Sequence, residues 1–176
     1  MVVKSADFLS NFMNELITPS PLGFIRMQET SGKLCMLQFL DNTPAVTNEC
    51  NSGFLLECNR QLKEYFEGNL TVFHFLLQSE QTGTVFQKKV WEQLIAIPFG
   101  STISYRQLAI NLGDEKCIRA AASANGQNNI AIAVPCHRVI GSDGSLTGYA
   151  GGLWRKKWLL EHEAKHSGKA VQGGLF

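Results

Sequence analysis

The sequence lacks several features that would assign it to a class at once. No stretch approaches the ~18 uninterrupted apolar residues of a membrane-spanning helix, and the opening MVVKSADF does not resemble a secretory signal. We found no internal repeat and no low-complexity segment. Only 18% of the residues are charged and 44% are hydrophobic, so the chain can bury a core. We therefore expect a globular protein of the cytoplasm without a membrane segment.

Paired cysteines are also missing. The five cysteines are odd in number and include no C-x-x-C pair, which argues against a disulfide framework and against a cysteine-rich zinc site. Free thiols in a reducing compartment are the expectation. His162 and His166 have the i, i+4 spacing that could bind a metal, but a solvated helix surface is the favoured interpretation. We predict no metal site.

The formal net charge of +1 hides opposite charges in the two halves of the chain. Residues 1–83 hold five Lys and Arg against nine Asp and Glu, a net charge of −4. Residues 84–160 hold nine against four, a net charge of +5. Such asymmetry hints at a polyanion-binding part beside an acidic part. Nucleic acid is therefore a candidate partner, which charge alone does not establish.

The first half of the chain contains predicted strands and one helix. Residues 23–30 and 33–40 are extended runs around a glycine-containing turn, which is a hairpin pattern. Residues 53–68 carry apolar side chains close to one helical face and predict a helix. Residues 70–77 are β-branched and aromatic enough to predict a buried strand. We expect residues 1–82 to form a small α/β lobe of mainly antiparallel strands.

A second lobe is expected to begin after the joint at residues 81–84. Thr84 and Gln87 have the spacing of a capping box, in which each side chain satisfies an orphan N–H at a helix start. The apolar stripe that follows ends at Pro98. We predict a mainly helical lobe over residues 83–165, followed by a flexible tail at residues 166–176.

Two short helices follow in this second lobe. Ser104 and Gln107 form another candidate capping box, and the helix they open stops at Gly113. The segment 116–126 is again helical in propensity. Two short helices joined by a glycine-containing turn form the helix-turn-helix pattern, although such pairs also occur as ordinary packing. DNA binding and plain packing both remain open at this point.

The second of these helices has an unusually bare surface. Ala120, Ala121, Ala122 and Ala124 would let its backbone approach a groove or another helix closely. Arg119 is the one long charged side chain near its start. A glycine-rich loop at residues 141–153 and a final amphipathic helix at residues 154–166 complete the lobe. In that last helix we expect the following residues to face inward: Trp154, Trp158 and Leu159.

The stretch AVPCHRVI, residues 133–140, places a cysteine directly before a histidine. A thiol attacks well only as thiolate, and its free pKa of ~8.5 requires a base near pH 7. His137 could remove the proton of Cys136, directly or through a water. Neighbouring residues on a strand point to opposite faces, so the two can meet only if the chain turns there. A nucleophile and a buried structural thiol both remain possible from these residues alone.

These motifs together resemble the O6-alkylguanine-DNA alkyltransferases, also called methylated-DNA–protein-cysteine methyltransferases. The resemblance is dense over residues 84–164, in FQKKVWEQLIAIPFGSTISYRQLA, RAAASANGQNN and VPCHRVIGSDGSLTGYAGGLWRKKWLLEHE. The first lobe matches loosely, as the more variable companion domain of the family. The resemblance implies a ribonuclease-H-like α/β first lobe and a mainly α second lobe with a winged-helix-like helix-turn-helix.

The resemblance also implies an activity. Members transfer an alkyl group from O6 of guanine in double-stranded DNA irreversibly to their own cysteine, with O4 of thymine as a further candidate position. The reaction implies an S-methyltransferase that acts once, without a cofactor. We accordingly expect a DNA repair protein that works as a monomer.

Five residues receive roles in the reaction through the resemblance. Cys136 would be the alkyl acceptor. His137 would deprotonate it through a water, and Glu163 would orient His137. Asn128 would help hold the active-site turn. Tyr105 would donate a proton toward N3 of guanine, for which a hydroxyl of pKa ~10 is a reasonable donor.

Further residues receive roles in binding. Arg119 would fill the space that a flipped base vacates, with its helix in the minor groove. The DNA-contacting set implied by the resemblance is Arg119, Tyr105, Arg106, Ala120, Ala121 and Ser142. The set implied for the base pocket is Val134, Tyr149 and Ala150, with Ser142 beside them. Without the resemblance, an ordinary surface turn is the preferred interpretation of that loop.

The chain departs from the family in one relevant place. Asn129 follows Asn128 where members commonly have proline, which puts the rigidity of that turn in question. Some relatives hold a structural zinc in the first lobe. The candidate ligands here do not match their arrangement, so again no metal is predicted: Cys35, Cys50, Cys58 and His74.

Three other functions compete with repair. A lesion-binding relative without activity typically carries tryptophan at the cysteine position, whereas Cys136 is present here. A helix-turn-helix regulator would prefer an operator sequence over a lesion. A cysteine hydrolase would need oxyanion donors and many turnovers.

The chain ends in QGGLF, from Gln172 to Phe176. This ending resembles the short linear motifs that dock to bacterial sliding clamps. An ordinary disordered terminus is the favoured alternative.

Overall fold

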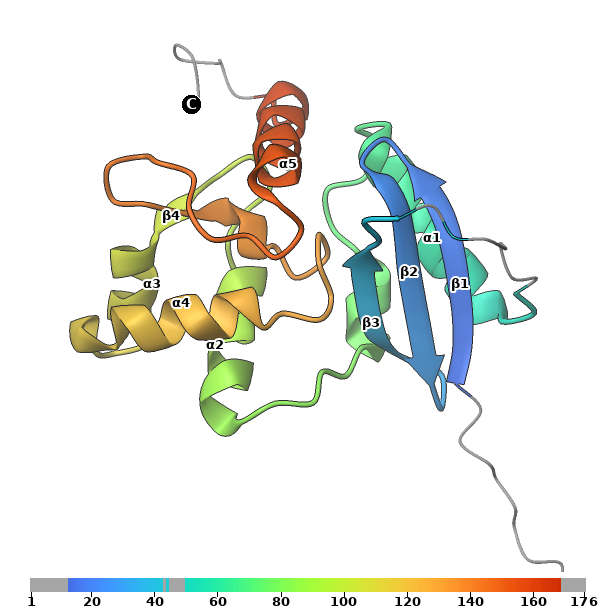
Figure 1. Ribbon diagram of the computed structural model, residues 1–176, viewed down its shortest axis with the longest axis horizontal. Coiled ribbons are helices and arrows are strands. Elements are labelled where there is room, and N and C mark those ends of the chain that lie inside the picture. The colour runs from blue at the N-terminus through green and yellow to red at the C-terminus, as the bar shows by residue number, and fades with distance from the viewer. Residues whose placement is uncertain (1–12, 43, 45–49, 169–176) are drawn as a thin grey trace, which may run out of the picture.

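The computed structural model describes residues 13–42, 44 and 50–168. The chain forms two lobes that lie side by side (Figure 1). The first contains a three-stranded sheet with one helix packed against it, and the second is mainly helical. The predicted clamp motif at residues 172–176 lies outside the described residues.

The sheet is antiparallel, in the order β1-β2-β3. Its strands are β1 (Met13–Ser20), β2 (Gly23–Thr30) and β3 (Lys33–Phe39). The turn between β2 and β3 has positive φ at both Ser31 and Gly32, which is the backbone twist that a two-residue hairpin requires. The predicted hairpin is therefore confirmed.

Strand β1 was missed by the sequence reasoning. Leu16, Ile17 and Thr18 are buried in succession, so the strand does not alternate between apolar and polar residues. Pro19 near its end is a poor strand residue, but among the described residues β1 pairs on one side only, and an edge strand tolerates proline.

Helix α1 (Gly53–Phe66) confirms the helix predicted at residues 53–68. Ser52 caps it by accepting a hydrogen bond from the N–H of Leu55. Leu55, Cys58 and Leu62 are buried in the core shared with the sheet. The helix ends before Gly68, whose positive φ of 80° stops it.

The strand predicted at residues 70–77 is wrong. The 3₁₀ helix η1 (His74–Gln78) occupies this stretch. Phe73 and Phe75 bury their rings in the core, whereas Val72 and Leu77 are exposed. The aromatic composition therefore reflects burial of single rings, which does not require a paired strand.

The second lobe contains four α-helices and a two-residue parallel pairing of β4 with β5. Its elements are α2 (Val85–Ile95), β4 (Ile103–Ser104), α3 (Tyr105–Asn111), η2 (Glu115–Cys117), α4 (Ile118–Gly126), η3 (Cys136–Arg138), β5 (Val139–Ile140) and α5 (Leu153–His166). The capping box of Thr84 and Gln87 is complete. Helices α3 and α4, joined by a turn in which Gly113 has positive φ, are the predicted helix pair.

Two expectations for the last helix were wrong. Trp154 is 57% exposed, whereas Leu159 is fully buried and Trp158 is half-buried. His162 does not belong to a solvated surface. Its ring is buried and stacked on Trp158 at 4.8 Å, and its Nε2 donates to the carbonyl of Tyr65 at 2.7 Å. This histidine therefore belongs to the contact between α5 and α1.

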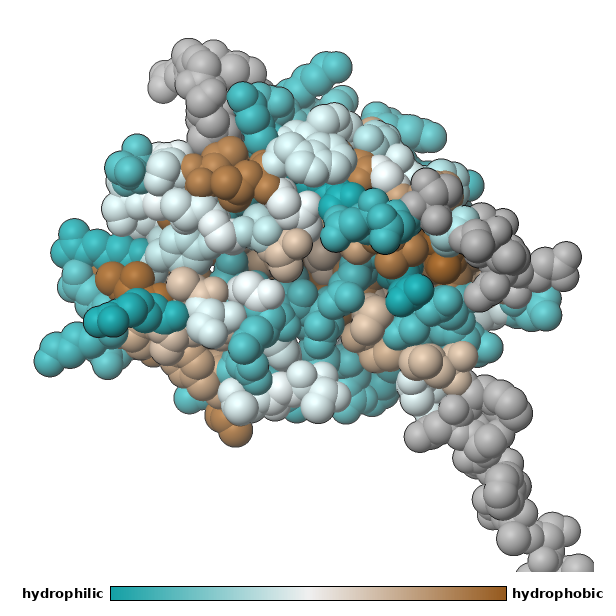
Figure 2. Space-filling view, viewed as in Figure 1, coloured by the Kyte–Doolittle hydropathy of each residue, from teal (hydrophilic) through white to brown (hydrophobic). Residues whose placement is uncertain are grey.

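The described residues contain neither a cluster of metal-ligating side chains nor a helix suited to span a membrane. Among these residues, no three His, Cys, Asp or Glu side chains gather as metal ligands would. None of the described helices combines the length and apolar character of a transmembrane segment. Some apolar side chains, such as Leu77 and Val85, are exposed. On the face shown in Figure 2, exposed apolar side chains lie scattered among hydrophilic ones.

Candidate active site

The two lobes meet along the segment that leads to Cys136. Leu37 of β3 donates its N–H to the carbonyl of Asn129 and accepts from the N–H of Ala131, both at 2.8 Å. Gln38 also donates to Asn129 Oδ1 at 3.1 Å. The edge strand of the first lobe therefore holds the approach to the cysteine by backbone pairing.

Asn129, which stands where members of the family commonly have proline, makes further contacts that hold the turn. Besides its bond with Gln38, its backbone N–H donates to Gln81 Oε1 at 2.7 Å, which a proline could not do. The turn is therefore held by contacts to the first lobe and the linker. A rigid ring is not needed for that.

Two tight turns present the cysteine. Ala133 donates its N–H to the carbonyl of Ala131 at 2.8 Å, and Ile132 between them has a φ of 67°, a strained conformation for a β-branched residue. Cys136 donates in the same way to Val134 across Pro135. Helix η3 then begins, so the chain bends at the required place. Strain of this kind is typical of functional sites.

The sulfur of Cys136 is buried, with 6% of the residue exposed. Asn128 Nδ2 donates to Sγ at 3.1 Å and to the carbonyl of Val134 at 2.8 Å, while Asn128 Oδ1 accepts from the N–H of Ile130. Asn128 thus ties the turn and also supplies a donor that favours the thiolate. Burial nevertheless raises the pKa of Cys136, so the resting form is the thiol and a base is needed.

His137 lies behind the cysteine, fully buried, with Nε2 2.8 Å from Glu163 Oε1. Burial lowers the pKa of His137 against the opposing effect of Glu163, so the ring rests neutral. A neutral ring that donates through Nε2 leaves Nδ1 as an acceptor. This Nδ1 is buried and has no hydrogen-bond partner among the described residues. It is free to receive a proton.

Glu163 is the most heavily bonded carboxylate of the site. Besides His137, Arg138 donates to both its oxygens at 2.9 Å, Tyr65 donates to Oε1 at 2.8 Å, and the N–H of Gly100 donates to Oε2 at 3.1 Å. Burial alone would raise the pKa of Glu163, but its bonds and charge contacts with His137 and Arg138 lower it well below the usual range. The group stays ionised. Sequence reasoning missed Tyr65 and Arg138 in this role.

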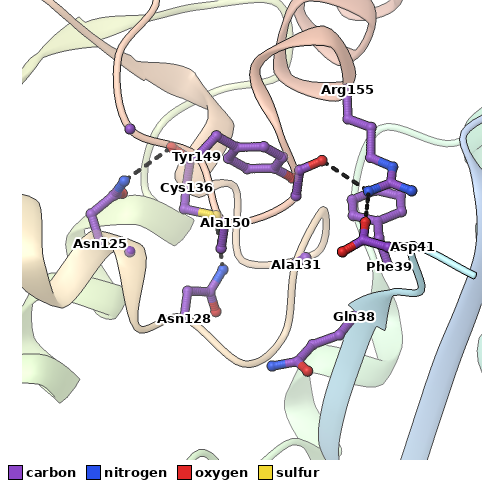
Figure 3. A pocket seen from close by; sticks show the side chains of 13 residues that line it. Gln38, Phe39, Asp41, Asn125, Asn128, Ala131, Cys136, Tyr149, Ala150 and Arg155 are labelled. Atoms are coloured by element: carbon purple, nitrogen blue, oxygen red, sulfur yellow. Dashed lines mark hydrogen bonds and ion pairs between the residues drawn. The ribbon is translucent and has the colours of Figure 1, made fainter.

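A cavity of about 160 Å³ opens beside Cys136 (Figure 3). Asn128 lies next to the sulfur, and Tyr149 and Ala150 of the glycine-rich loop form part of the wall. Both lobes contribute to the lining, which consists of Gln38, Phe39, Asp41, Asn125, Gly126, Asn128, Ala131, Cys136, Gly148, Tyr149, Ala150, Gly151 and Arg155. The contribution of the first lobe was invisible in the sequence, because it depends on how the lobes dock.

Two buried cations of α5 hold the loop that covers the cavity. Arg155 donates to the carbonyls of Leu22, Leu40 and Gly151, and to Asp41, at 2.9–3.2 Å. The sequence WRKKW gave no sign of this, because charged residues on a helix usually face solvent.

Lys156 is fully buried as well. Its Nζ donates to the carbonyls of Val139 and Thr147, both at 2.7 Å. Burial lowers the pKa of Lys156 to about 8. These bonds join Val139, just before the glycine-rich loop, and Thr147, in the middle of the loop, to the last helix.

Tyr105 lies at the other side of the loop, at the start of α3. Its hydroxyl is within 3.4 Å of the carbonyls of Thr147 and Gly148 and donates to them. Burial raises the pKa of Tyr105, so the hydroxyl keeps its proton. The nearby Tyr149 hydroxyl is buried without a partner among the described residues.

Four of the residues predicted to contact DNA are exposed. Arg119 and Ala120 are exposed on α4, and Arg106 is exposed on α3, where it pairs with Glu115 at 2.6 Å. Ser142 is exposed outside the cavity lining.

Two of the residues predicted for binding, Ala121 and Val134, are instead buried. Ala121 is fully buried in the hydrophobic core, because it lies on the face of α4 opposed to solvent, and it cannot contact DNA. Val134 is 1% exposed and is not among the residues that line the cavity, and its carbonyl accepts a hydrogen bond from Asn128.

Comparison with known proteins gives matches over both lobes. Residues 13–78 match the ribonuclease-like domain of 6-O-methylguanine DNA methyltransferase, and residues 85–165 match its DNA-binding domain. A methylated-DNA–protein-cysteine methyltransferase of Methanosarcina barkeri is 44% identical over 151 residues, which cover 84% of this chain and 94% of the relative. One from Salmonella typhimurium is 54% identical over 103 residues, covering 58% and 60%.

Solved structures agree in fold over nearly the whole chain. The crystal structure of Mycobacterium tuberculosis O6-methylguanine methyltransferase has a TM-score of 0.78 at 37% identity, covering 92% of this chain and 97% of its own. The M. tuberculosis OGT in complex with DNA has a TM-score of 0.77 at 40% identity, covering 85% and 92%. The ribonuclease-like and helical DNA-binding lobes expected from the sequence are therefore the observed fold.

Proposed function

The chain belongs to the family of methylated-DNA–protein-cysteine methyltransferases, and on that premise we propose that it repairs DNA by moving an alkyl group from O6 of guanine onto Cys136. The observation that carries the assignment of the acceptor is the surroundings of the sulfur. It faces a cavity, receives a hydrogen bond from Asn128, and is followed by the buried pair of His137 and Glu163.

The transfer is a direct displacement. A water passes the thiol proton of Cys136 to Nδ1 of His137, and Glu163 stabilises the imidazolium that forms. The thiolate attacks the saturated carbon on O6, so the C–S bond forms as the C–O bond breaks. Guanine leaves with the electron pair of that bond. No tetrahedral intermediate forms, and the reaction therefore does not call for an oxyanion hole.

Tyr105 completes the proton balance. Charge builds on the leaving base, and the Tyr105 hydroxyl, which burial keeps protonated, donates its proton to N3. Its place opposite Thr147 and Gly148 puts the hydroxyl beside the loop that forms the cavity wall. The product on sulfur is a stable thioether. Each molecule therefore acts once, as a methyltransferase whose acceptor is itself.

The target base must leave the stack to reach a buried thiol, at a cost of a few kcal/mol. Arg119, exposed on α4, would fill the vacated space, and the small side chain of Ala120 beside it would let the helix approach the groove. Arg106 and Ser142 are exposed positions for contacts with the backbone. Minor-groove recognition is nearly independent of sequence, which suits repair at any guanine.

We also propose the oligomeric state, the location and the partners of the protein. It acts as a monomer in the cytoplasm, on the nucleoid when bound to double-stranded DNA, and without a cofactor. The ending Gln172–Phe176 is a candidate contact with the sliding clamp on sequence grounds only. Pull-down with the clamp, comparing the full chain with one lacking residues 172–176, tests that contact. Equal recovery would reject it.

The central test is intact-protein mass after incubation with a duplex that carries one O6-methylguanine. We expect a gain of one methylene, limited to one per molecule and absent from Cys136→Ser. Cys117→Ser, which alters a half-buried free thiol away from the cavity, is the matched control and should gain the methylene normally. Binding of the lesion without any mass gain would make the protein a damage-recognition module and overturn the proposal.

A further inference from the structure

We propose that Tyr65, a residue of the first lobe, is a positioning residue of the relay that deprotonates Cys136. Its hydroxyl crosses between the lobes and fixes the carboxylate of Glu163. This inference rests on the proposed function of Cys136. It also gives the first lobe a defined part in the chemistry beyond supporting the fold.

The geometry places three donors on one carboxylate oxygen. Glu163 Oε1 accepts from the Tyr65 hydroxyl at 2.8 Å and from Arg138 Nη2 at 2.9 Å, and it lies 2.8 Å from His137 Nε2. Tyr65 is the only one of these three donors that comes from the first lobe. Because the oxygen is shared, a displacement of the Tyr65 hydroxyl moves the acceptor that orients His137.

The position of Tyr65 is strongly determined by its neighbours. The ring is fully buried and contacts Phe66, Phe73 and Phe99, with centroids 5.2–6.0 Å apart. Its backbone carbonyl accepts from His162 Nε2 at 2.7 Å, one residue before Glu163 on α5. The same tyrosine is thus held to α5 at both its backbone and its hydroxyl.

The hydroxyl acts on His137 through the carboxylate. Burial raises the pKa of Tyr65 well above its usual value, so the group always donates. A donor on Oε1 draws charge from Glu163 and weakens its pull on a proton at His137. The ring then rests neutral, as a base must. The other titratable or charged groups that bear on this cluster are Arg138, Lys156, Cys136, Tyr149 and His162.

The test removes the hydroxyl alone, with Tyr65→Phe. Without this donor, Glu163 keeps more negative charge on Oε1 and raises the proton affinity of His137, so we expect the acid limb of the pH–rate profile to move up by roughly half to one pH unit. Two rates are followed at each pH: methyl transfer from the lesion duplex in a single turnover, and carboxamidomethylation of Cys136 by iodoacetamide, read by peptide mass. The second rate does not depend on DNA repair.

A matched control is Phe73→Leu, which loosens the packing on Tyr65 and leaves the hydroxyl in place. The proposal is supported if the acid limb of the pH–rate profile shifts in Tyr65→Phe and is unchanged in Phe73→Leu. An unshifted limb in Tyr65→Phe, or equal shifts in both variants, overturns it. If wild type reacts with iodoacetamide but never gains methyl from the duplex, the proposed function fails while the limb shift still judges Tyr65.

A second variant guards against poor folding of Tyr65→Phe. Replacing Tyr65 with 3-fluorotyrosine makes the hydroxyl a stronger donor, because fluorine lowers its pKa, and keeps the ring. The acid limb should then move in the opposite direction, to lower pH. A shift to higher pH, or none, would contradict the role of the hydroxyl.

Discussion

The two lobes bury different kinds of side chain, although both are packed around apolar cores. Among the described residues, the first lobe buries the polar side chains of Thr18, Glu29 and Gln61, besides the hydroxyl of Tyr65. The second lobe buries the following set: Asn125, Asn128, His137, Arg138, Arg155, Lys156, His162 and Glu163. Buried charges are a poor source of stability, whereas apolar side chains are a good one.

The two lobes therefore have different roles. The second lobe contains buried ions, which reduce its stability, because a base, an orienting carboxylate and a loop in a fixed position are needed around Cys136. The first lobe supplies apolar packing. Its contacts with the site include Tyr65, β3 and the carbonyls of Leu22 and Leu40 that bind Arg155.

The largest effect should follow Glu163→Gln. The change leaves Arg138 buried with a neutral partner and removes the stabilisation of the imidazolium at His137. We expect the free energy of unfolding to fall by about 3–5 kcal/mol and methyl transfer to slow roughly 10²- to 10⁴-fold. Urea denaturation and single-turnover kinetics measure the two losses.

The matched change in the first lobe is Met27→Ala, at a fully buried position of β2. It should cost about 2–5 kcal/mol through lost burial and a cavity, yet leave the transfer rate per folded molecule at the wild-type value. A comparable slowing in Met27→Ala would show that the lobes are not divided in this way.

Arg155→Met is expected to have the next largest effect. It keeps the length of the side chain but takes the donor from the carbonyls of Leu22, Leu40 and Gly151. We expect a loss of about 2–3 kcal/mol and a several-fold slower transfer, since Tyr149 is then less firmly held at the cavity.

The control for this change is Arg60→Met, which removes exposed ion pairs on α1 and should cost less than about 1 kcal/mol. Thermal melts and transfer kinetics of both variants decide the matter. A variant of Arg155 as stable and as fast as Arg60→Met would remove its role in holding the loop.

Acidification should weaken the second lobe specifically. Burial lowers the pKa of both His137 and His162, so the unfolded chain takes up protons near pH 6.5 that the folded chain refuses. Stability is therefore highest above that pH and falls as the pH drops through it, by about 1 kcal/mol for each histidine whose pKa is shifted by one unit. Glu163, whose pKa is lowered, adds stability above pH ~4 that is lost in stronger acid.

Melting temperature measured between pH 8 and pH 5 tests this dependence. His162→Gln keeps a donor for the carbonyl of Tyr65 but cannot titrate, and it should flatten the slope below pH 6.5. His74→Gln, at an exposed position of the first lobe, should keep the wild-type slope. The same slope in all three proteins would assign the acid sensitivity elsewhere.

The smallest effect concerns the contact of Asn129 with Gln38 between the lobes. Asn129→Ala and Gln38→Ala should each cost about 0.5–1.5 kcal/mol, and the double variant should cost less than their sum, because one hydrogen bond is lost in all three. The pair of Asn129→Ala with Lys33→Ala should be additive. Additivity in both pairs would mean that the observed bond does not couple the lobes.

Much of the fold was predictable because local patterns agree with it. The capping box of Thr84 and Gln87 and the turn at Ser31 and Gly32 are local signals, and the structure contains both. The strand predicted at residues 70–77 failed because burial of Phe73 and Phe75 produces the same composition without pairing. Strand β1 was missed because an edge strand with three buried residues in a row has no alternation.

The sequence by itself determined the family, the two lobes and the reactive motif of Cys136 and His137, since these depend on residues that are close together in the chain. The tertiary structure alone decided which side chains complete the site. Tyr65 and Glu163 are 98 residues apart, and Arg155 and Leu22 are 133 apart, so no local pattern records their contact. Such contacts exist because docking of the lobes buries polar groups, and buried polar groups must find partners wherever the fold brings them.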